Sequence, residues 1–139
     1  GVGVRVRVEI EHGGRRVTTV ALANTGFEGD VPEILVPVNL AERLGVWPRL
    51  PENTVVESYR TASGLMRVYR IPGAKVRLVT EEGAGDPVES FIVVAEYADE
   101  ALINDQMISA MGIVIEDPAR GLWRLRGEDR VRRSVAPPP

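Results

Sequence analysis

The stretch Val20-Ala21-Leu22-Ala23-Asn24-Thr25-Gly26-Phe27-Glu28-Gly29-Asp30 decides the fold predicted for this chain. Its first four residues are apolar, which is typical of a buried strand. The strand runs directly into a short polar turn, in which a glycine follows Thr25. Because glycine leaves room for a close backbone approach, this arrangement presents the side chain of residue 24 at a fixed point.

The residues on either side of this stretch predict a mainly β chain. From Val2 to Ile10, apolar residues alternate with charged residues, a period of two that indicates a half-buried strand. A turn at 11–15 leads to the returning strand, Val17 to Ala23. Further strands are expected at 31–36, 55–60, 65–71, 75–80, 88–95 and 122–125. The segments 61–64 and 81–87 are expected to be turns because they are rich in glycine and polar residues.

A short helix is expected directly after Pro37. Proline favours the first turn of a helix, and Leu40, Ala41 and Leu44 would lie on one face of it. Gly45 then stands just beyond the predicted end of the helix, where glycine is common.

Composition limits the classes of function. The chain has 139 residues, which predicts one domain, and it has no cysteine and one histidine. A disulfide framework and a histidine-based metal site are therefore not expected, and the lack of cysteine fits a cytoplasmic protein. No apolar run reaches 18 residues and the N-terminal residues do not resemble a signal peptide, so no membrane association is expected. The net charge of −3 argues against nucleic acid as a partner.

The central stretch resembles the retroviral-type, or retropepsin-like, aspartic proteases and their single-domain archaeal and bacterial relatives. Those chains carry two apolar residues, then Asp-Thr-Gly-Phe-x-Gly, a strand, a proline and a short helix that ends in Leu-Gly. The matching residues in this chain are Thr25, Gly26, Phe27, Gly29, Pro37, Leu44 and Gly45. One position departs from the pattern, because Asn24 stands where the family has its catalytic aspartate.

A second point of resemblance lies at 101–116. The family has an apolar pair, a glycine, two polar residues and a short helix before a strand. Ile108 and Met111 fit the inner face of that helix, and Gly112 fits its C-terminal cap. Asn104 replaces the usual glycine, and asparagine is the residue expected to tolerate left-handed backbone best after glycine. Asp105 is expected as a charge at the N-terminus of the helix.

The resemblance spans about residues 4–125 and implies a fold. This is a retropepsin-like closed acid-protease half-barrel over residues 1–126, with one or two short helices, a flap hairpin and a homodimeric assembly. Residues 127–139 are expected to form a charged, proline-rich tail that is mobile or extended.

The resemblance also implies a site. Its catalytic turn would be Asn24, Thr25 and Gly26, and its substrate-binding residues would be Phe27, Glu28, Asp30, Ala62, Ser63, Gly64 and Ile103. In the family the threonine hydroxyl bonds across the dimer axis, a role that Thr25 can keep, whereas the alternative is a bond within its own turn. Glu28 and Asp30 have a plainer interpretation as solvated carboxylates of a loop. No cofactor and no metal are implied.

Aspartic proteases cut peptides with two carboxylates that share one proton, because like charges about 3 Å apart cannot both ionise. A chain with one such turn needs a two-fold homodimer to bring two of them together. Asn24 carries a carboxamide, which can hold a water or a carbonyl but cannot remove a proton. Loss of acid–base catalysis costs about 10²- to 10⁴-fold, so this chain is expected to be inactive or nearly so.

Several functions remain open at this point. The first is an aspartic endopeptidase-like homodimer acting on peptide or unfolded protein, with catalysis disabled by Asn24. The second is a non-catalytic dimer that binds peptide or protein. A third, nucleic-acid binding, would use the arginines of the C-terminal region, but the acidic total opposes it: Arg120, Arg124, Arg126, Arg130, Arg132 and Arg133. The sequence also leaves two origins for Asn24, natural divergence or a deliberate change.

Overall fold

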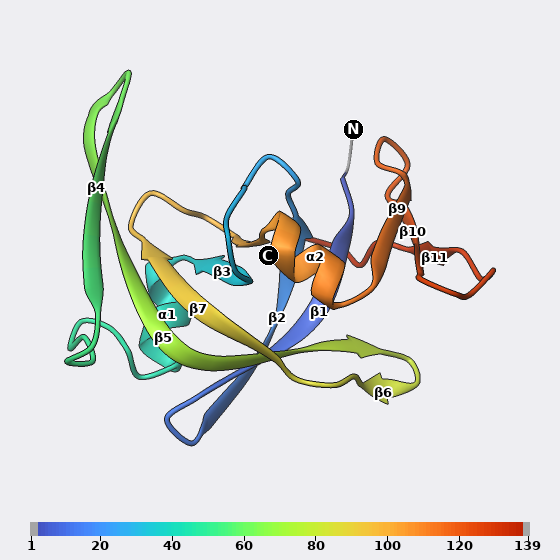
Figure 1. Ribbon diagram of the computed structural model, residues 1–139, viewed down its shortest axis with the longest axis horizontal. Helices are drawn as coiled ribbons and strands as arrows, with labels where there is room; N and C mark the ends of the chain where they lie inside the picture. The colour runs from blue at the N-terminus through green and yellow to red at the C-terminus, as the bar shows by residue number, and fades with distance from the viewer. Residues whose placement is uncertain (1–2, 138–139) are drawn as a thin grey trace.

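The computed structural model describes residues 3–137 and has a mainly β architecture (Figure 1). The first half of the chain forms β1 (Arg5–His12), β2 (Arg15–Ala23), β3 (Glu33–Val36), α1 (Val38–Arg43), β4 (Val55–Thr61) and β5 (Gly64–Thr80). The second half forms β6 (Gly83–Ala84), β7 (Val88–Ala95), β8 (Ala101–Ile103), α2 (Asp105–Ala110), β9 (Ile113–Asp117), β10 (Leu122–Leu125) and β11 (Arg132–Arg133). The predicted mainly β fold with one or two short helices is confirmed. Within residues 3–137 neither helix is long and apolar enough to cross a bilayer.

Six strands close into a barrel in the order β1-β2-β8-β3-β7-β5, and β5 pairs with β1 to complete the ring. The sheet is mixed, since the β2–β8 and β3–β7 pairs are parallel and the other four pairs are antiparallel. Closure of the ring satisfies backbone groups that an open sheet would leave at its edges.

The interior of the barrel is filled by the residues that the strand alternation predicts. On β1 the valines and the isoleucine point inward and are at most 1% exposed, whereas the charged residues between them point outward. Side chains from all six strands and both helices join this core. The predicted period of two in the first strand is therefore confirmed.

A second apolar cluster covers the other face of β3, β5, β7 and β8. Along each of these strands, its members alternate with residues of the barrel core: on β3, for example, Leu35 lies between Ile34 and Val36. The cluster consists of Leu35, Val68, Val93 and Ala95, with Phe27, Phe91, Ala98 and Leu102 packed against them. The barrel thus carries an apolar surface outside as well as inside, and this outer surface supports the site described below.

Strand β5 differs from the prediction. The sequence predicted separate strands at 65–71 and 75–80, but a single strand of 17 residues runs through both. Pro72 and Gly73 interrupt its pairing with β7 between Ile71 and Ala74 without ending the strand. The predicted hairpin is present, because the first half of β5 pairs with β4 around the Thr61–Gly64 turn. This β4–β5 hairpin projects beyond the barrel at the upper left of Figure 1.

The C-terminal region is extended and is packed onto the barrel as far as it is described. Arg132–Arg133 forms β11, which pairs with β10, and β10 pairs with β9 in a separate three-stranded sheet. The amide of Val135 donates to the carbonyl of Arg5 at 3.1 Å, which ties this segment to β1. Residues 132–135 are therefore part of the fold.

Candidate functional site

The Asn24 turn lies where two neighbouring parallel strands end. Strands β2 and β8 run side by side with Ala23 opposite Ile103, so residues 24 and 104 both follow the carboxyl ends of strands. The amide of Asn24 donates to the carbonyl of Ile103 at 3.0 Å, which extends the pairing by one residue. The two segments that the sequence singled out, 20–30 and 101–116, therefore meet in space.

Asn24 is half-buried, and its side chain forms a hydrogen bond within its own turn. Its Oδ1 accepts a hydrogen bond from the amide of Gly26 at 3.0 Å, and its carbonyl accepts one from the amide of Phe27 at 3.1 Å. Thr25 and Gly26 are exposed at the apex of the turn. A carboxamide held this way offers an Nδ2 donor to a ligand, but it has no proton-accepting group for hydrolysis.

Asn104 is fully buried, and its side chain joins the 31–33 segment to the start of α2. Its Oδ1 accepts hydrogen bonds from the amides of Glu33, at 2.9 Å, and Met107, at 3.0 Å, while its Nδ2 donates to the carbonyl of Val31 at 2.9 Å. The tolerance of asparagine for left-handed backbone is not needed here, because the φ of Asn104 is −85°. The residue instead caps α2, a role for which a side-chain oxygen is needed and glycine has none.

Asp105 lies in the first turn of α2, as predicted, and also holds the loop of the site. Its Oδ1 accepts from the amide of Gly29 at 3.1 Å, and its own amide donates to the carbonyl of Phe27 at 3.1 Å. With Asn104, it fixes the 27–33 segment at both ends. The loop is consequently held by hydrogen bonds rather than by apolar contacts alone.

A pocket of about 460 Å³ opens beside this loop, over the outer apolar cluster. Its floor is apolar and comes from β3, β5 and β7, with Leu35, Val68 and Val93. Its remaining lining is the 27–31 loop together with Glu33, Glu57, Arg70 and Tyr97. The lining thus combines residues from five separate segments of the chain.

The predicted site residues divide into four groups. Phe27, Glu28 and Asp30 line the pocket, whereas Asn24, Thr25 and Gly26 lie in the adjoining turn. Ala62, Ser63 and Gly64 are exposed at the end of the β4–β5 hairpin and do not line the pocket. The side chain of Ile103 is fully buried in the barrel core, because alternation along β8 points it inward and turns Leu102 toward the outer cluster.

Sequence reasoning missed a charged pair at the pocket wall. Arg70 Nη2 lies 3.1 Å from Glu33 Oε1, and its guanidinium stands over the Phe91 ring at 4.1 Å from the ring centre. Burial raises the pKa of the Glu33 carboxyl, and the neighbouring Arg70 only partly offsets this effect. Glu57 also lies near Arg70, at 3.7 Å. Charged residues inside apolar strand runs were the signal that could have identified this pair.

The pocket has a formal excess of negative charge. Its lining includes four acidic residues, Glu28, Asp30, Glu33 and Glu57, against one basic residue, Arg70, which leaves an excess of three. Among residues 3–137 no group of three or more His, Cys, Asp or Glu is arranged to hold a metal ion. The excess of carboxylates at the rim gives this side of the pocket a negative potential.

The arginines named for nucleic-acid binding are largely engaged in local contacts. Arg124 pairs with Glu116, Arg130 with Glu81 and Glu82, and Arg132 with Glu82 and Glu128. Arg126 donates to the carbonyl of Ser109 at 3.2 Å.

No protein-family model matches the chain, and no curated protein matches it either.

Proposed function

We propose that this chain is a retropepsin-like protein that binds an extended peptide as a homodimer and does not hydrolyse it. The observation that carries the proposal is the position of the Asn24 turn. It stands at the paired ends of β2 and β8, beside a pocket with an apolar floor and an acidic rim.

Three features support the retropepsin-like assignment. The Asn24-Thr25-Gly26 turn follows a barrel strand, and each of the two segments that resemble the family continues into a short helix, α1 or α2. The β4–β5 hairpin occupies the place in the chain where the family has its flap. In Figure 1 the tip of this hairpin and the 24–32 loop both rise at the top of the view.

The dimer follows from the chemistry of such a site. One chain supplies one Asn24 turn, and a two-fold axis beside the turn would place Asn24 of one protomer opposite Asn24 of its partner. The exposed Thr25 at the apex of the turn is available for a bond across that axis.

Binding without cleavage follows from residue 24. Hydrolysis by a carboxylate dyad needs one group to remove a proton from water and another to polarise the scissile carbonyl. Two carboxamides can hydrogen-bond a peptide carbonyl but can perform neither proton transfer. The second candidate function is an aspartic endopeptidase, and the same turn supports it. Hydrolysis of a peptide by the unaltered chain would favour this second candidate.

The lining of the pocket supports a preference for peptides of a particular composition. Leu35, Val68 and Val93 would pack against an apolar side chain, and the excess of carboxylates at the rim would attract a lysine or arginine. We therefore expect the ligand to be an unstructured segment in which apolar and basic residues lie close together.

Calorimetry with two synthetic peptides tests this function. One peptide alternates leucine and lysine, and the other has each lysine replaced by glutamine. The first should bind to the protein without being cut and the second should bind more weakly. Analytical ultracentrifugation of the same sample should show a dimer. A monomeric protein that binds neither peptide would overturn the proposal.

The variant Asn24→Asp tests the ancestry of the site. It restores the carboxylate at position 24, so cleavage of an unstructured protein with an acidic optimum should appear, at a rate at least about 10²-fold above that of the unaltered chain. The matched control is Asn53→Asp, which makes the same chemical change at an exposed loop residue. Equal cleavage by the unaltered chain and Asn24→Asp would show that hydrolysis does not depend on residue 24.

A further inference from the structure

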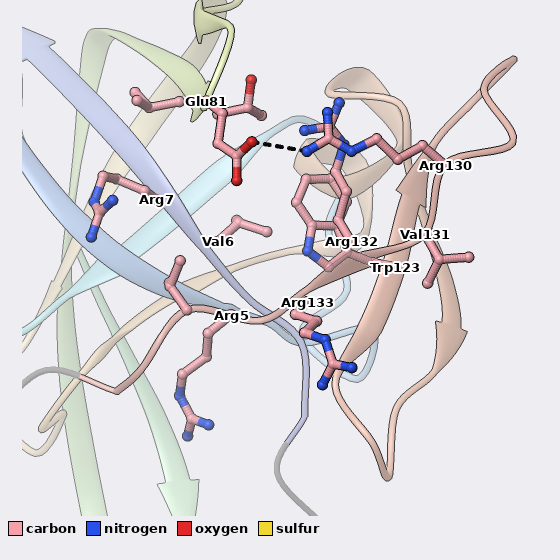
Figure 2. Close-up of a pocket in the computed structure, with 12 residues that line it drawn as sticks. Arg5, Val6, Arg7, Glu81, Trp123, Arg130, Val131, Arg132 and Arg133 are labelled. Carbon is pink, nitrogen blue, oxygen red and sulfur yellow. Dashed lines mark hydrogen bonds and ion pairs between the residues drawn. The ribbon is translucent and has the colours of Figure 1, made fainter.

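A second pocket, of about 470 Å³, lies between the barrel and the C-terminal segment (Figure 2). It is lined by residues of β1, the end of β5 with Glu81 after it, β10, and residues 130–133 and 135, and it shares no lining residue with the peptide pocket. It is formed because residues 132–135 pack against β10 and Arg5.

The walls of this pocket carry two buried hydrogen-bond donors without a partner. The indole Nε1 of Trp123 and the guanidinium Nε of Arg132 are buried and make no hydrogen bond, and among the side chains that the structure describes no other buried nitrogen or oxygen shares this state. Trp123 is 5% exposed and Arg132 is 8% exposed, and both residues line the pocket. Most buried polar atoms in proteins have a partner, so an acceptor that reached these two donors would satisfy groups that the protein itself leaves unpaired.

The rest of the lining also favours an acceptor with negative charge. Five arginines surround the pocket: Arg5, Arg7, Arg130, Arg132 and Arg133. The one acidic residue in the lining, Glu81, is paired with Arg130 at 2.9 Å (Figure 2). Arg7 and Arg133 make no ion pair with any residue in the 3–137 range. These two guanidinium groups can therefore bind a ligand without breaking a contact of the protein.

We propose that this pocket binds a small organic anion through its phosphate or carboxylate group. Both groups only accept hydrogen bonds when ionised, which matches the donors of Trp123 and Arg132, and both form charge-assisted bonds with arginine. The volume exceeds that of an isolated phosphate, and Val131 and Val135 supply apolar wall for the remainder of the molecule.

The indole of Trp123 provides a direct test. The chain has two tryptophans, so Trp47→Phe leaves Trp123 as the only source of an indole N–H signal in a ¹H–¹⁵N spectrum. Three probes are added separately: inorganic phosphate, citrate and adenosine monophosphate. The indole resonance should shift and saturate with at least one of them. A response to phosphate or the nucleotide would identify a phosphate-bearing ligand, and a response to citrate alone a carboxylate-bearing ligand.

A charge variant tests whether the binding uses the pocket. Arg7→Gln combined with Arg133→Gln removes two exposed guanidinium groups, so the fold should persist while the dissociation constant of the active probe rises about 10-fold or more. The matched control is Arg49→Gln, an exposed arginine outside the pocket, which should leave the dissociation constant unchanged. An indole signal unmoved by all three probes, or an equal effect of Arg49→Gln and the double variant, would overturn the proposal.

Discussion

Gly29 lies so close to Asn104 that a Cβ added at position 29 would stand 2.9 Å from Asn104 Nδ2. The same Cβ would stand 2.9 Å from Glu33 Oε1. Real Cβ atoms do not occur at such distances, so position 29 requires glycine for space rather than for an unusual φ. The close contact also shows how tightly the 27–33 loop is packed onto the start of α2.

Gly29→Ala should therefore destabilise the protein. Asn104 cannot move away without loss of its three hydrogen bonds, and overpacking of this kind costs about 1–3 kcal/mol. Urea unfolding measures the loss. Gly85→Ala is the control, because the nearest atom to its added Cβ lies at 3.4 Å. Equal stability of Gly29→Ala and the unaltered chain would contradict the packing described for the loop.

Asn104→Ala should lower the free energy of unfolding by more than the loss of an ordinary helix N-cap does. The substitution leaves the amides of Glu33 and Met107 and the carbonyl of Val31 without their partner, and buried groups left unpaired cost about 1–3 kcal/mol each before water enters. We expect a decrease of roughly 2–4 kcal/mol in the free energy of unfolding. The exposed Asn53→Ala provides the comparison and should change stability little.

The buried Glu33 makes stability depend on pH in a definite direction. Because burial raises its pKa in the folded state, the folded protein binds this proton more tightly than the unfolded chain does. The contribution of Glu33 to the free energy of unfolding is therefore fully present below the pKa of the unfolded chain, about 4.5. This contribution is lost as the pH rises through the higher pKa of the folded state. Glu33→Gln removes this titration, so the stability of the variant relative to the unaltered chain should increase as pH rises across that window.

Unfolding by urea at a series of pH values checks this expectation. Glu28→Gln, which removes an exposed carboxylate from the same pocket, serves as the control. A difference between Glu33→Gln and the unaltered chain that stays constant with pH would mean that Glu33 is not desolvated in the folded protein.

Ser134 joins the C-terminal segment to the N-terminal strand. Its Oγ accepts from the amide of Arg5 at 2.9 Å and lies within hydrogen-bond distance of the carbonyls of Gly3 and Gly121. Ser134→Ala should lower the free energy of unfolding by about 1–2 kcal/mol, measured by thermal or urea unfolding. Ser109→Ala, at an exposed position, should have a small effect. If both variants behave alike, residues 132–135 are not held on the barrel in solution.

The acidic rim should govern the affinity of the peptide pocket. Glu28→Gln combined with Asp30→Asn removes two exposed carboxylates, each expected to contribute up to about 1 kcal/mol. The affinity for the lysine-containing peptide should fall roughly 5- to 30-fold, and the affinity for its glutamine counterpart should not change. Glu52→Gln, outside the pocket, is the control for loss of negative charge. An equal loss of affinity for both peptides would indicate that the rim does not recognise charge.

Local sequence patterns identified most of the strands and both helices. The alternation that ends at Ile10 identified β1, although Val2 lies outside the described residues, and the 122–125 segment coincides with β10. Pro37 and Gly45 bracket α1, and Gly112, with φ at +72°, follows the end of α2 as predicted. These features could be predicted because side-chain periodicity, proline and glycine act on the backbone within a few residues.

The sequence by itself thus determined most of the strands, the two helix positions and the chemistry that Asn24 excludes, whereas β6, β8 and β11 were not predicted. The tertiary structure decided the closure of the barrel, the capping role of Asn104, the Glu33–Arg70 pair and the packing of residues 132–135. These features depend on which strands pair and in which register, and register sets whether a residue faces the core, the outer cluster or solvent. Glu33 and Val31, which bond to the Asn104 side chain, are more than 70 positions from it in the chain, so no local pattern records these contacts.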